Sequence, residues 1–158
     1  MDCTFKTTEG KFNYRVAAII KNGSKILMAN NPEYKTCCYS VGGRVRLNET
    51  LEEAIVREVF EETGIKAEID RMGFIHENFF TNFEGELYHE LSIFFYIKPN
   101  EEILKIKDGH LTNDGPNGEY LKWIDINEKQ DINIYPEFYL TELKNPSEHI
   151  RHIVTKDN

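Results

Sequence analysis

The residues from Gly43 to Ile65, GRVRLNETLEEAIVREVFEETGI, form the stretch that decides the fold of this chain. Thr50 is followed three residues later by Glu53, a spacing typical of the capping box that begins a helix. Gly64 suits the left-handed residue after a helix, because glycine has no Cβ to clash there. The residues between contain no Gly or Pro and are rich in good helix formers. The sequence therefore predicts a helix over residues 51–63.

The acids of this helix lie on its apolar side. At about 100° per residue, the face that carries Leu51 and Ile55 also carries Glu58 and Glu62. Together with Glu61 they form three carboxylates at i, i+3 and i+4, where like charges repel one another. A solvated acidic face would lie opposite the apolar residues, whereas clustered carboxylate oxygens are what Mg²⁺, Mn²⁺ or Ca²⁺ prefer. The pattern therefore favours a site for a hard cation over a solvated acidic face.

The composition of the chain indicates one globular domain over residues 1–158. Hydrophobic residues make up 40% and charged residues 29% of the sequence, which excludes a disordered chain. No apolar run approaches the length of a membrane span, and the N-terminal residues lack the apolar core of a signal peptide. We therefore expect one domain with a real core and no membrane association.

The net charge restricts the partners that we expect, and the cysteines restrict the expected cellular location. The formal net charge of −8 opposes binding to nucleic acid polymers and to anionic membranes. A small phosphorylated substrate stays possible, because a bound cation can invert the local field. The three cysteines have neither CxxC nor Cys/His zinc spacing, and Cys37 and Cys38 are adjacent. We expect reduced thiols in a cytoplasmic protein.

Strand patterns dominate the rest of the chain. Asn22-Gly23 between two apolar runs is a strong hairpin signal, and the glycine pair Gly42-Gly43 allows close approach of the backbone to a ligand. Residues 67–80 contain two strand-like pieces with Gly73 as a bulge or bend. The expected strands are residues 12–20, 25–29, 39–41, 67–80, 86–97, 103–106, 119–124 and 149–154, with a helical turn at 125–129 and a second helix at 135–143. This alternation predicts an α+β domain.

The stretch from Gly43 to Ile65 resembles the Nudix box, G-x5-E-x7-R-E-U-x-E-E-x-G-U, where U is a bulky aliphatic residue. Every fixed position is present in this sequence: Gly43, Glu49, Arg57, Glu58, Val59, Glu61, Glu62, Gly64 and Ile65. The strand and hairpin before the box, and the late strand that carries Trp123, are also similar to the family. Two nearby positions depart from its commonest form, since Val41 replaces a frequent Pro and Asn48 a frequent Gly.

The resemblance implies the Nudix fold, a mixed β-sheet sandwiched between α-helices. It also implies Mg²⁺- or Mn²⁺-dependent hydrolysis of a nucleoside diphosphate linked to another moiety, and dimers are common in the family. Carried over by position, Glu58, Glu61 and Glu62 would bind the metal, and the carbonyl of Gly42 or Gly43 could add a ligand. An ion pair of Arg57 with Glu49 would orient the loop on the helix.

Several residues outside the helix are candidates for proton transfer. Glu119 precedes the Trp123 strand, and Glu90 interrupts an apolar strand; each could accept the proton of an attacking water. The alternatives are a surface acid at a strand end for Glu119 and a half-exposed strand face for Glu90. For His76, His89 and His110 the sequence favours a structural or a solvated role over a catalytic one.

Phosphate and base recognition have their own candidates. Arg15, Arg44 and Arg46 suit phosphate, since the last two flank the proposed metal site in an otherwise acidic chain. The alternative for Arg44 and Arg46 is ordinary solvation in a loop. An aromatic platform for a base could come from Phe80 and its neighbours Phe79, Phe83 and Tyr88, for which hairpin packing is the alternative. We expect the loops at 30–36 and 108–118 to discriminate between substrates.

Three functions remain open on the sequence alone. The first is a Mg²⁺-dependent pyrophosphohydrolase acting on a small nucleotide-derived substrate, for which Glu90 and Phe80 are candidate contacts. The second is a Nudix-fold module that senses a nucleotide without hydrolysis, against which the intact acidic set argues. The third is an isomerase of a small diphosphate, although nothing marks Cys37 or Cys38 as activated.

Overall fold

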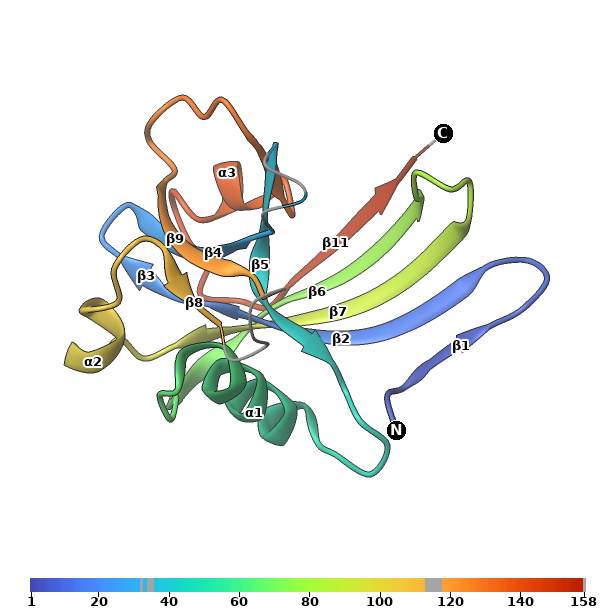
Figure 1. Cartoon of the computed structure of the whole chain (residues 1–158), viewed down its shortest axis with the longest axis horizontal. Coiled ribbons are helices and arrows are strands. Elements are labelled where there is room, and N and C mark those ends of the chain that lie inside the picture. Colours follow the sequence, from blue (N-terminus) through green and yellow to red (C-terminus); the bar gives the residue numbers. More distant parts are fainter. Residues whose placement is uncertain (32, 34–35, 113–117, 158) are drawn as a thin grey trace.

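The computed structural model describes residues 1–31, 33, 36–112 and 118–157, which form a mixed β-sheet with one long and two short helices (Figure 1). The main path of the sheet runs β11-β6-β7-β2-β5-β4-β9-β8, and β1, β10 and β3 pair with β2, β5 and β4. Strand pairs β2–β7, β6–β11 and β5–β10 are parallel, and the others are antiparallel. Within the described ranges no helix is long and apolar enough to cross a membrane. The α+β architecture expected from the sequence is confirmed.

The strands have the following bounds: β1 Thr4–Lys6, β2 Lys11–Ile19, β3 Lys21–Asn22, β4 Lys25–Asn30, β5 Cys37–Arg44, β6 Ile69–Thr81, β7 Leu87–Ile97, β8 His110–Leu111, β9 Tyr120–Asp125, β10 Asn133–Tyr135 and β11 Arg151–Lys156. The helices are α1 Leu51–Thr63, α2 Glu101–Leu104 and α3 Tyr139–Glu142.

Helix α1 begins and ends where the sequence predicts. The Thr50 side chain accepts a hydrogen bond from the backbone N–H of Glu53, and the Glu53 side chain accepts one from the backbone N–H of Thr50. Gly64 has the left-handed conformation, with φ of 75°, and its N–H donates to the carbonyl of Phe60. Both ends of the helix therefore satisfy backbone groups that would otherwise lack partners.

Strand β5 changes its neighbour halfway along its length, and this places the box. Its first half pairs with β4, as in Met28↔Ser40, and its second half pairs with β2, as in Val16↔Gly43. The chain leaves β5 at Arg44, turns through the box loop and returns as α1. The C-terminal half of α1 consequently lies against the glycine pair, as the contact of the Glu58 carboxylate with Gly43 shows.

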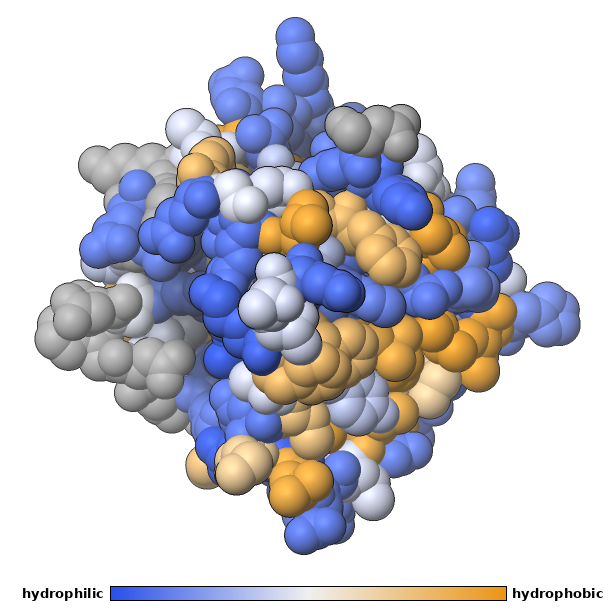
Figure 2. Space-filling model, turned by 90° about the vertical axis from the view of Figure 1, so that its right-hand side faces the viewer, coloured by the Kyte–Doolittle hydropathy of each residue, from blue (hydrophilic) through white to orange (hydrophobic). Residues whose placement is uncertain are grey.

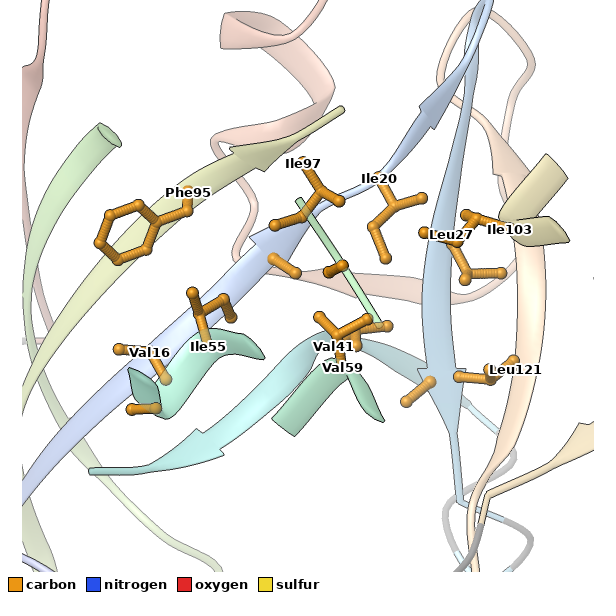
Figure 3. Packing of buried hydrophobic residues seen from close by; sticks show 14 of the residues in the cluster. Val16, Ile20, Leu27, Val41, Ile55, Val59, Phe95, Ile97, Ile103 and Leu121 are labelled. Atoms are coloured by element: carbon orange, nitrogen blue, oxygen red, sulfur yellow. The ribbon is translucent and has the colours of Figure 1, made fainter. Parts of the chain in front are cut away.

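Two hydrophobic clusters lie on opposite faces of the strands. On the α1 face, Ile55 and Val59 point from the helix toward Val41 and the strands behind it (Figure 3). On the other face, Tyr139 of α3 is fully buried and packs edge-on against Phe94. The alternation along β7 agrees with the sequence pattern, since Ile93 belongs to the first cluster and Phe94 to the second.

The region after β7 differs from the sequence prediction at three places. The expected strand at 103–106 is wrong, because Asn100 caps the short helix α2 through the N–H of Ile103. The expected helix at 135–143 is reduced to α3, and residues 133–135 pair with β5 as strand β10. Residues 126–128 form turns and a bend rather than a helical turn. Short apolar runs do not distinguish a strand from a buried helical turn, which explains the first error.

Gly73 marks an irregularity in β6, as expected, although residues 69–81 form one strand rather than two pieces. The register between β6 and β7 shifts between Met72 and Phe74. A Cβ on Gly73 would lie 2.5 Å from the ring of Tyr96. The glycine therefore allows the ring of Tyr96 to pack closely against β6 at the bulge.

Strands β1, β2, β7, β6 and β11 extend beyond α1 and α3 as an open arm (Figure 1). Seen from its open end, hydrophobic side chains gather in a band with polar side chains on either side (Figure 2). On the α1 face of the arm, Phe5 stacks on Phe12 at 5.2 Å, Phe12 contacts His89, and His89 lies 4.3 Å from Phe79. These rings pack against one another across neighbouring strands.

Burial of His76 predicts a pH-dependent stability. His76 is 4% exposed, its Nε2 lies 2.9 Å from Thr155 Oγ1 of β11, and burial lowers its pKa from 6.5 to about 4. Between these values the unfolded chain binds the proton and the folded chain does not, so stability falls as the pH falls. We expect this histidine to contribute a loss of about 2–3 kcal/mol between pH 7 and pH 4.

Urea unfolding of wild type and His76→Gln at several pH values measures this contribution. The variant should have a flatter dependence between pH 6.5 and 4, whatever its stability at pH 7. Parallel curves for the two proteins would show that His76 does not titrate as its burial requires.

Candidate active site

An open cavity of about 450 Å³ lies where the box helix meets β2 and β5. It is polar and contains both acids and arginines. The residues that line it are Asp2, Arg15, Asn31, Gly42, Gly43, Arg44, Arg46, Arg57, Glu58, Glu62, Gly118 and Glu119. The cavity therefore joins the box to residues from the N-terminal segment, from β2, from the residue after β4 and from the two residues before β9.

Arg57 is the centre of the ion-pair network in this cavity. Its Nε and Nη2 donate to the two carboxylate oxygens of Glu49 at 2.5 and 2.9 Å. Nη2 also donates to the carbonyl of Arg44 at 3.0 Å, and Nη1 donates to Glu58 at 2.6 Å and Glu61 at 3.2 Å. These five contacts match the five N–H groups of a guanidinium. One side chain thus connects the box loop, β5 and two acids of the helix.

Glu58 is held against the backbone of β5. A Cβ on Gly43 would lie 2.5 Å from the carboxylate carbon and oxygens of Glu58. The absence of a side chain at Gly43 therefore makes room for this carboxylate. Burial raises the pKa of Glu58, while the hydrogen bond and charge of Arg57 act in the opposite direction.

Glu62 and Glu61 occupy different environments. Glu62 is 7% exposed, and its Oε1 accepts a hydrogen bond of 3.4 Å from the backbone N–H of Gly42. Glu61 is 41% exposed at its side chain, and its Oε1 lies 3.4 Å from Nη2 of Arg46. The three acids thus range from buried to exposed, with Glu61 nearest to bulk solvent.

Glu49 completes the network from the box loop. Besides its bonds to Arg57, it accepts a hydrogen bond from the backbone N–H of Arg46 at 2.8 Å. The hydrogen bond from Arg57 holds the pKa of Glu49 below its ordinary value, and the acids in turn raise the pKa of Arg57. Glu49 therefore stays ionised and fixes the loop on the helix.

The donor set fits a hard divalent cation. Glu58, Glu61 and Glu62 supply carboxylate oxygens on adjoining turns of one helix, and oxygen ligands are those that Mg²⁺ and Mn²⁺ take. A cation would also offset the cost of burying the Glu58 charge. In the described part of the chain no three acidic, His or Cys side chains already converge as a metal cluster, and Arg57 engages Glu58 and Glu61 instead.

The structure brings together most of the residues that the sequence singled out. Arg15, Arg44 and Arg46 lie around the cavity with the box acids, and Arg15 is the cross-strand neighbour of Arg44. Asp2 lies 3.6 Å from Nη1 of Arg44. Glu119 also lines the cavity, although it is far from the box in sequence.

Two predicted substrate contacts lie outside this cavity. Phe80 stacks on Tyr88 at 4.9 Å near the open end of the arm, and Glu90 of β7 accepts a hydrogen bond from Asn13. His89 lies among the aromatic rings of the arm. His110 is in β8 outside the cavity lining, and residues 32, 34–35 and 113–117 of the two expected specificity loops lie outside the described residues.

Sequence reasoning missed Asp2 as a lining residue, whereas Asn31 and Gly118 belong to the loops at 30–36 and 108–118 that were expected to discriminate between substrates. Asp2 reaches the cavity because β1 pairs with β2 and because the backbone of Asp2 forms an isolated antiparallel β-bridge with that of Arg46. An isolated acid in a polar N-terminal segment gives no pattern, so no local signal could have found it. The sequence did not specify the conformation of the loops that contain Asn31 and Gly118.

Comparison with known proteins places the chain in a family. The model of the NUDIX domain matches residues 11–139, which is most of the sequence. The chain therefore belongs to the Nudix family, whose members generally use divalent metal ions.

Relatives with curated names match over short segments. An ADP-ribose pyrophosphatase of Methanocaldococcus jannaschii is 49% identical over 53 residues, which are 32% of this chain and 31% of that protein. An NAD-capped RNA hydrolase NudC of Vibrio atlanticus is 45% identical over 51 residues, which are 32% of this chain and 19% of that protein. The chain thus spans less than a third of the length of either relative.

Solved structures agree over most of the chain. A MutT protein from Bacillus halodurans has a TM-score of 0.62 at 16% identity and covers 91% of this chain and 90% of its own. The Escherichia coli ORF135 protein has a TM-score of 0.53 at 25% identity, covering 80% of this chain and 82% of its own. These similarities establish the fold.

Gly43→Ala tests the close contact between β5 and the box helix. The added Cβ would displace the Glu58 carboxylate, which is the flexible end of a side chain, so the fold should survive. We expect turnover to fall about 10- to 100-fold, as for other small displacements of catalytic groups, with little change in melting temperature. Gly43→Ala with wild-type turnover would show that the position of Glu58 is not critical.

Proposed function

We propose that this chain is a Mg²⁺- or Mn²⁺-dependent pyrophosphohydrolase that cleaves a nucleoside diphosphate linked to another moiety. The observation that carries the proposal is the cavity in which box acids and arginines meet. The name of one curated relative, an ADP-ribose pyrophosphatase, supports the same substrate class. The chain has no disulfide among its described cysteines, in keeping with a cytoplasmic location.

Glu58, Glu61 and Glu62 would hold the divalent cation. Such a cation, when bound, would neutralise charge on the diphosphate and acidify a water molecule. Arg15, Arg44 and Arg46 would bind the phosphate oxygens, because guanidinium groups form paired hydrogen bonds with them. Their positions around the cavity would fix the diphosphate beside the box acids.

Hydrolysis requires a group that takes a proton from water. The water oxygen bonds to phosphorus, the bridging P–O bond breaks, and a carboxylate accepts the proton. We infer that Glu119 is the acceptor outside the box, because it lines the cavity and Glu90 does not. A box glutamate could also serve, and Glu119→Gln distinguishes them: we expect about a 100-fold loss of kcat if Glu119 is the base.

The test is a substrate panel with Mg²⁺ or Mn²⁺. ADP-ribose, a nucleotide sugar, NADH, a dinucleoside polyphosphate and ATP should be incubated with the protein and the products separated by chromatography. Release of two phosphorylated products from a diphosphate-linked substrate supports the proposal. Tight binding of a nucleotide without product would favour the alternative, a module that senses the nucleotide.

A further inference from the structure

A row of polar side chains crosses the arm on the face that α3 covers farther along. Cross-strand register places Thr4 opposite Asn13, Asn13 opposite Glu90, and Glu90 opposite Asn78. Residues in register on neighbouring strands point to the same face of a sheet. Strands β1, β2, β7 and β6 thus contribute one residue each to a continuous row.

Glu90 is fixed in this row by a buried amide. Asn13 is 2% exposed, and its Nδ2 donates to Oε2 of Glu90 at 2.9 Å. Its Oδ1 accepts a hydrogen bond of 2.6 Å from the hydroxyl of Thr4. Both ends of the amide are therefore engaged, which restricts Asn13 to one orientation. Glu90 is half-buried, and its Oε1 makes no hydrogen bond within the described ranges.

The row lies one step from the arginines of the cavity. Arg15 follows Asn13 by two residues on β2, so both side chains leave the same face of the strand about 7 Å apart. Arg15 lines the cavity and is the register neighbour of Ser92, two residues after Glu90 on β7. A group attached to a diphosphate at Arg15 can therefore reach the carboxylate of Glu90.

We propose that this row is a sugar-binding subsite in which Glu90 accepts hydrogen bonds from sugar hydroxyls of the substrate. The inference rests on the proposed function, since the diphosphate at Arg15 brings the sugar there. A carboxylate accepts hydrogen bonds from hydroxyl donors and repels phosphate, so the row suits the uncharged sugar beside the diphosphate. The amide of Asn78 adds both a donor and an acceptor.

Binding measurements in the Glu61→Gln background, where hydrolysis is suppressed, test the subsite without relying on turnover. The probes are ADP-ribose, which carries sugars, and inorganic pyrophosphate, which carries none, each titrated by calorimetry with Mg²⁺. Adding Glu90→Gln should weaken the binding of ADP-ribose about 10- to 100-fold, which is the range for the loss of a hydrogen bond to a charged group. Pyrophosphate affinity should stay equal or rise slightly, because a negative charge near Arg15 is removed.

Glu77→Gln is the matched control. Glu77 is on β6 next to Asn78 but on the opposite face, where it pairs with His152 at 2.7 Å. Its replacement should leave both affinities unchanged. Thr4→Val removes the hydrogen bond to the Asn13 amide and should weaken the binding of ADP-ribose about 2- to 10-fold. Such a loss would identify Thr4 as a positioning residue.

Unchanged ADP-ribose affinity in Glu90→Gln, or an equal loss for both probes, overturns the subsite. Failure of the proposed function would give a different result. If the unsubstituted chain binds ADP-ribose and Glu90→Gln weakens that binding, but the unsubstituted chain releases no product from ADP-ribose or from the other panel compounds, hydrolysis is wrong and the subsite stands.

Discussion

Glu61→Gln is expected to lower turnover about 1000-fold while leaving the fold and its stability intact. Glutamine has nearly the shape of glutamate but lacks the charge that a divalent cation needs. The Glu61 side chain is 41% exposed and makes contacts of 3.2 Å to Arg57 and 3.4 Å to Arg46. Exposed polar contacts contribute little to stability, so the free energy of unfolding should change by less than about 0.5 kcal/mol.

Steady-state kinetics at several Mg²⁺ concentrations, with a thermal melt, measure both effects. Glu52→Gln is the control, because Glu52 is an exposed acid in the first turn of the same helix. It lies about 13 Å along the helix axis from Glu61 and should turn over substrate like wild type. Retention of more than a tenth of wild-type turnover by Glu61→Gln would remove this residue from the metal site.

The helix could be predicted from the sequence because its signals are local. The capping box at Thr50, the stop at Gly64 and the apolar stripe all act within 15 residues, and the structure has the same bounds. The half-buried position of Glu58 and the buried position of Glu62 also follow from helical periodicity. The local part of the site can therefore be predicted from the sequence.

The distant part of the site depends on strand pairing, which local patterns do not specify. Arg15 meets the box because β5 leaves β4 and joins β2 halfway along its length, and Asp2 meets it because Asp2 forms an isolated β-bridge with Arg46. The row of Thr4, Asn13 and Glu90 needs the parallel pairing of β2 with β7, strands separated by about half of the chain. Glu90 is an unusual acid within an apolar strand, but only the register of the strands identifies its cross-strand neighbours.

Arg57→Lys is expected to lower both turnover and stability, although it keeps the positive charge. Lysine has three donors on one nitrogen and no planar fork, so it cannot contact Glu49, Glu58 and Glu61 together. Arg57 is 18% exposed at its side chain, and the loss leaves partly buried carboxylates with fewer partners. We expect a loss of about 1–3 kcal/mol in the free energy of unfolding and about 100-fold in kcat/KM.

Denaturant unfolding and kinetics of Arg57→Lys separate the two effects, with Arg151→Lys as the matched control. Arg151 makes an exposed ion pair with Glu142 at 3.2 Å, and such pairs contribute at most about 1 kcal/mol. Because Glu58, Glu61 and Glu62 remain in Arg57→Lys, raising Mg²⁺ should recover part of the lost turnover. A variant that is less stable but turns over substrate normally would restrict Arg57 to holding the box loop on the helix.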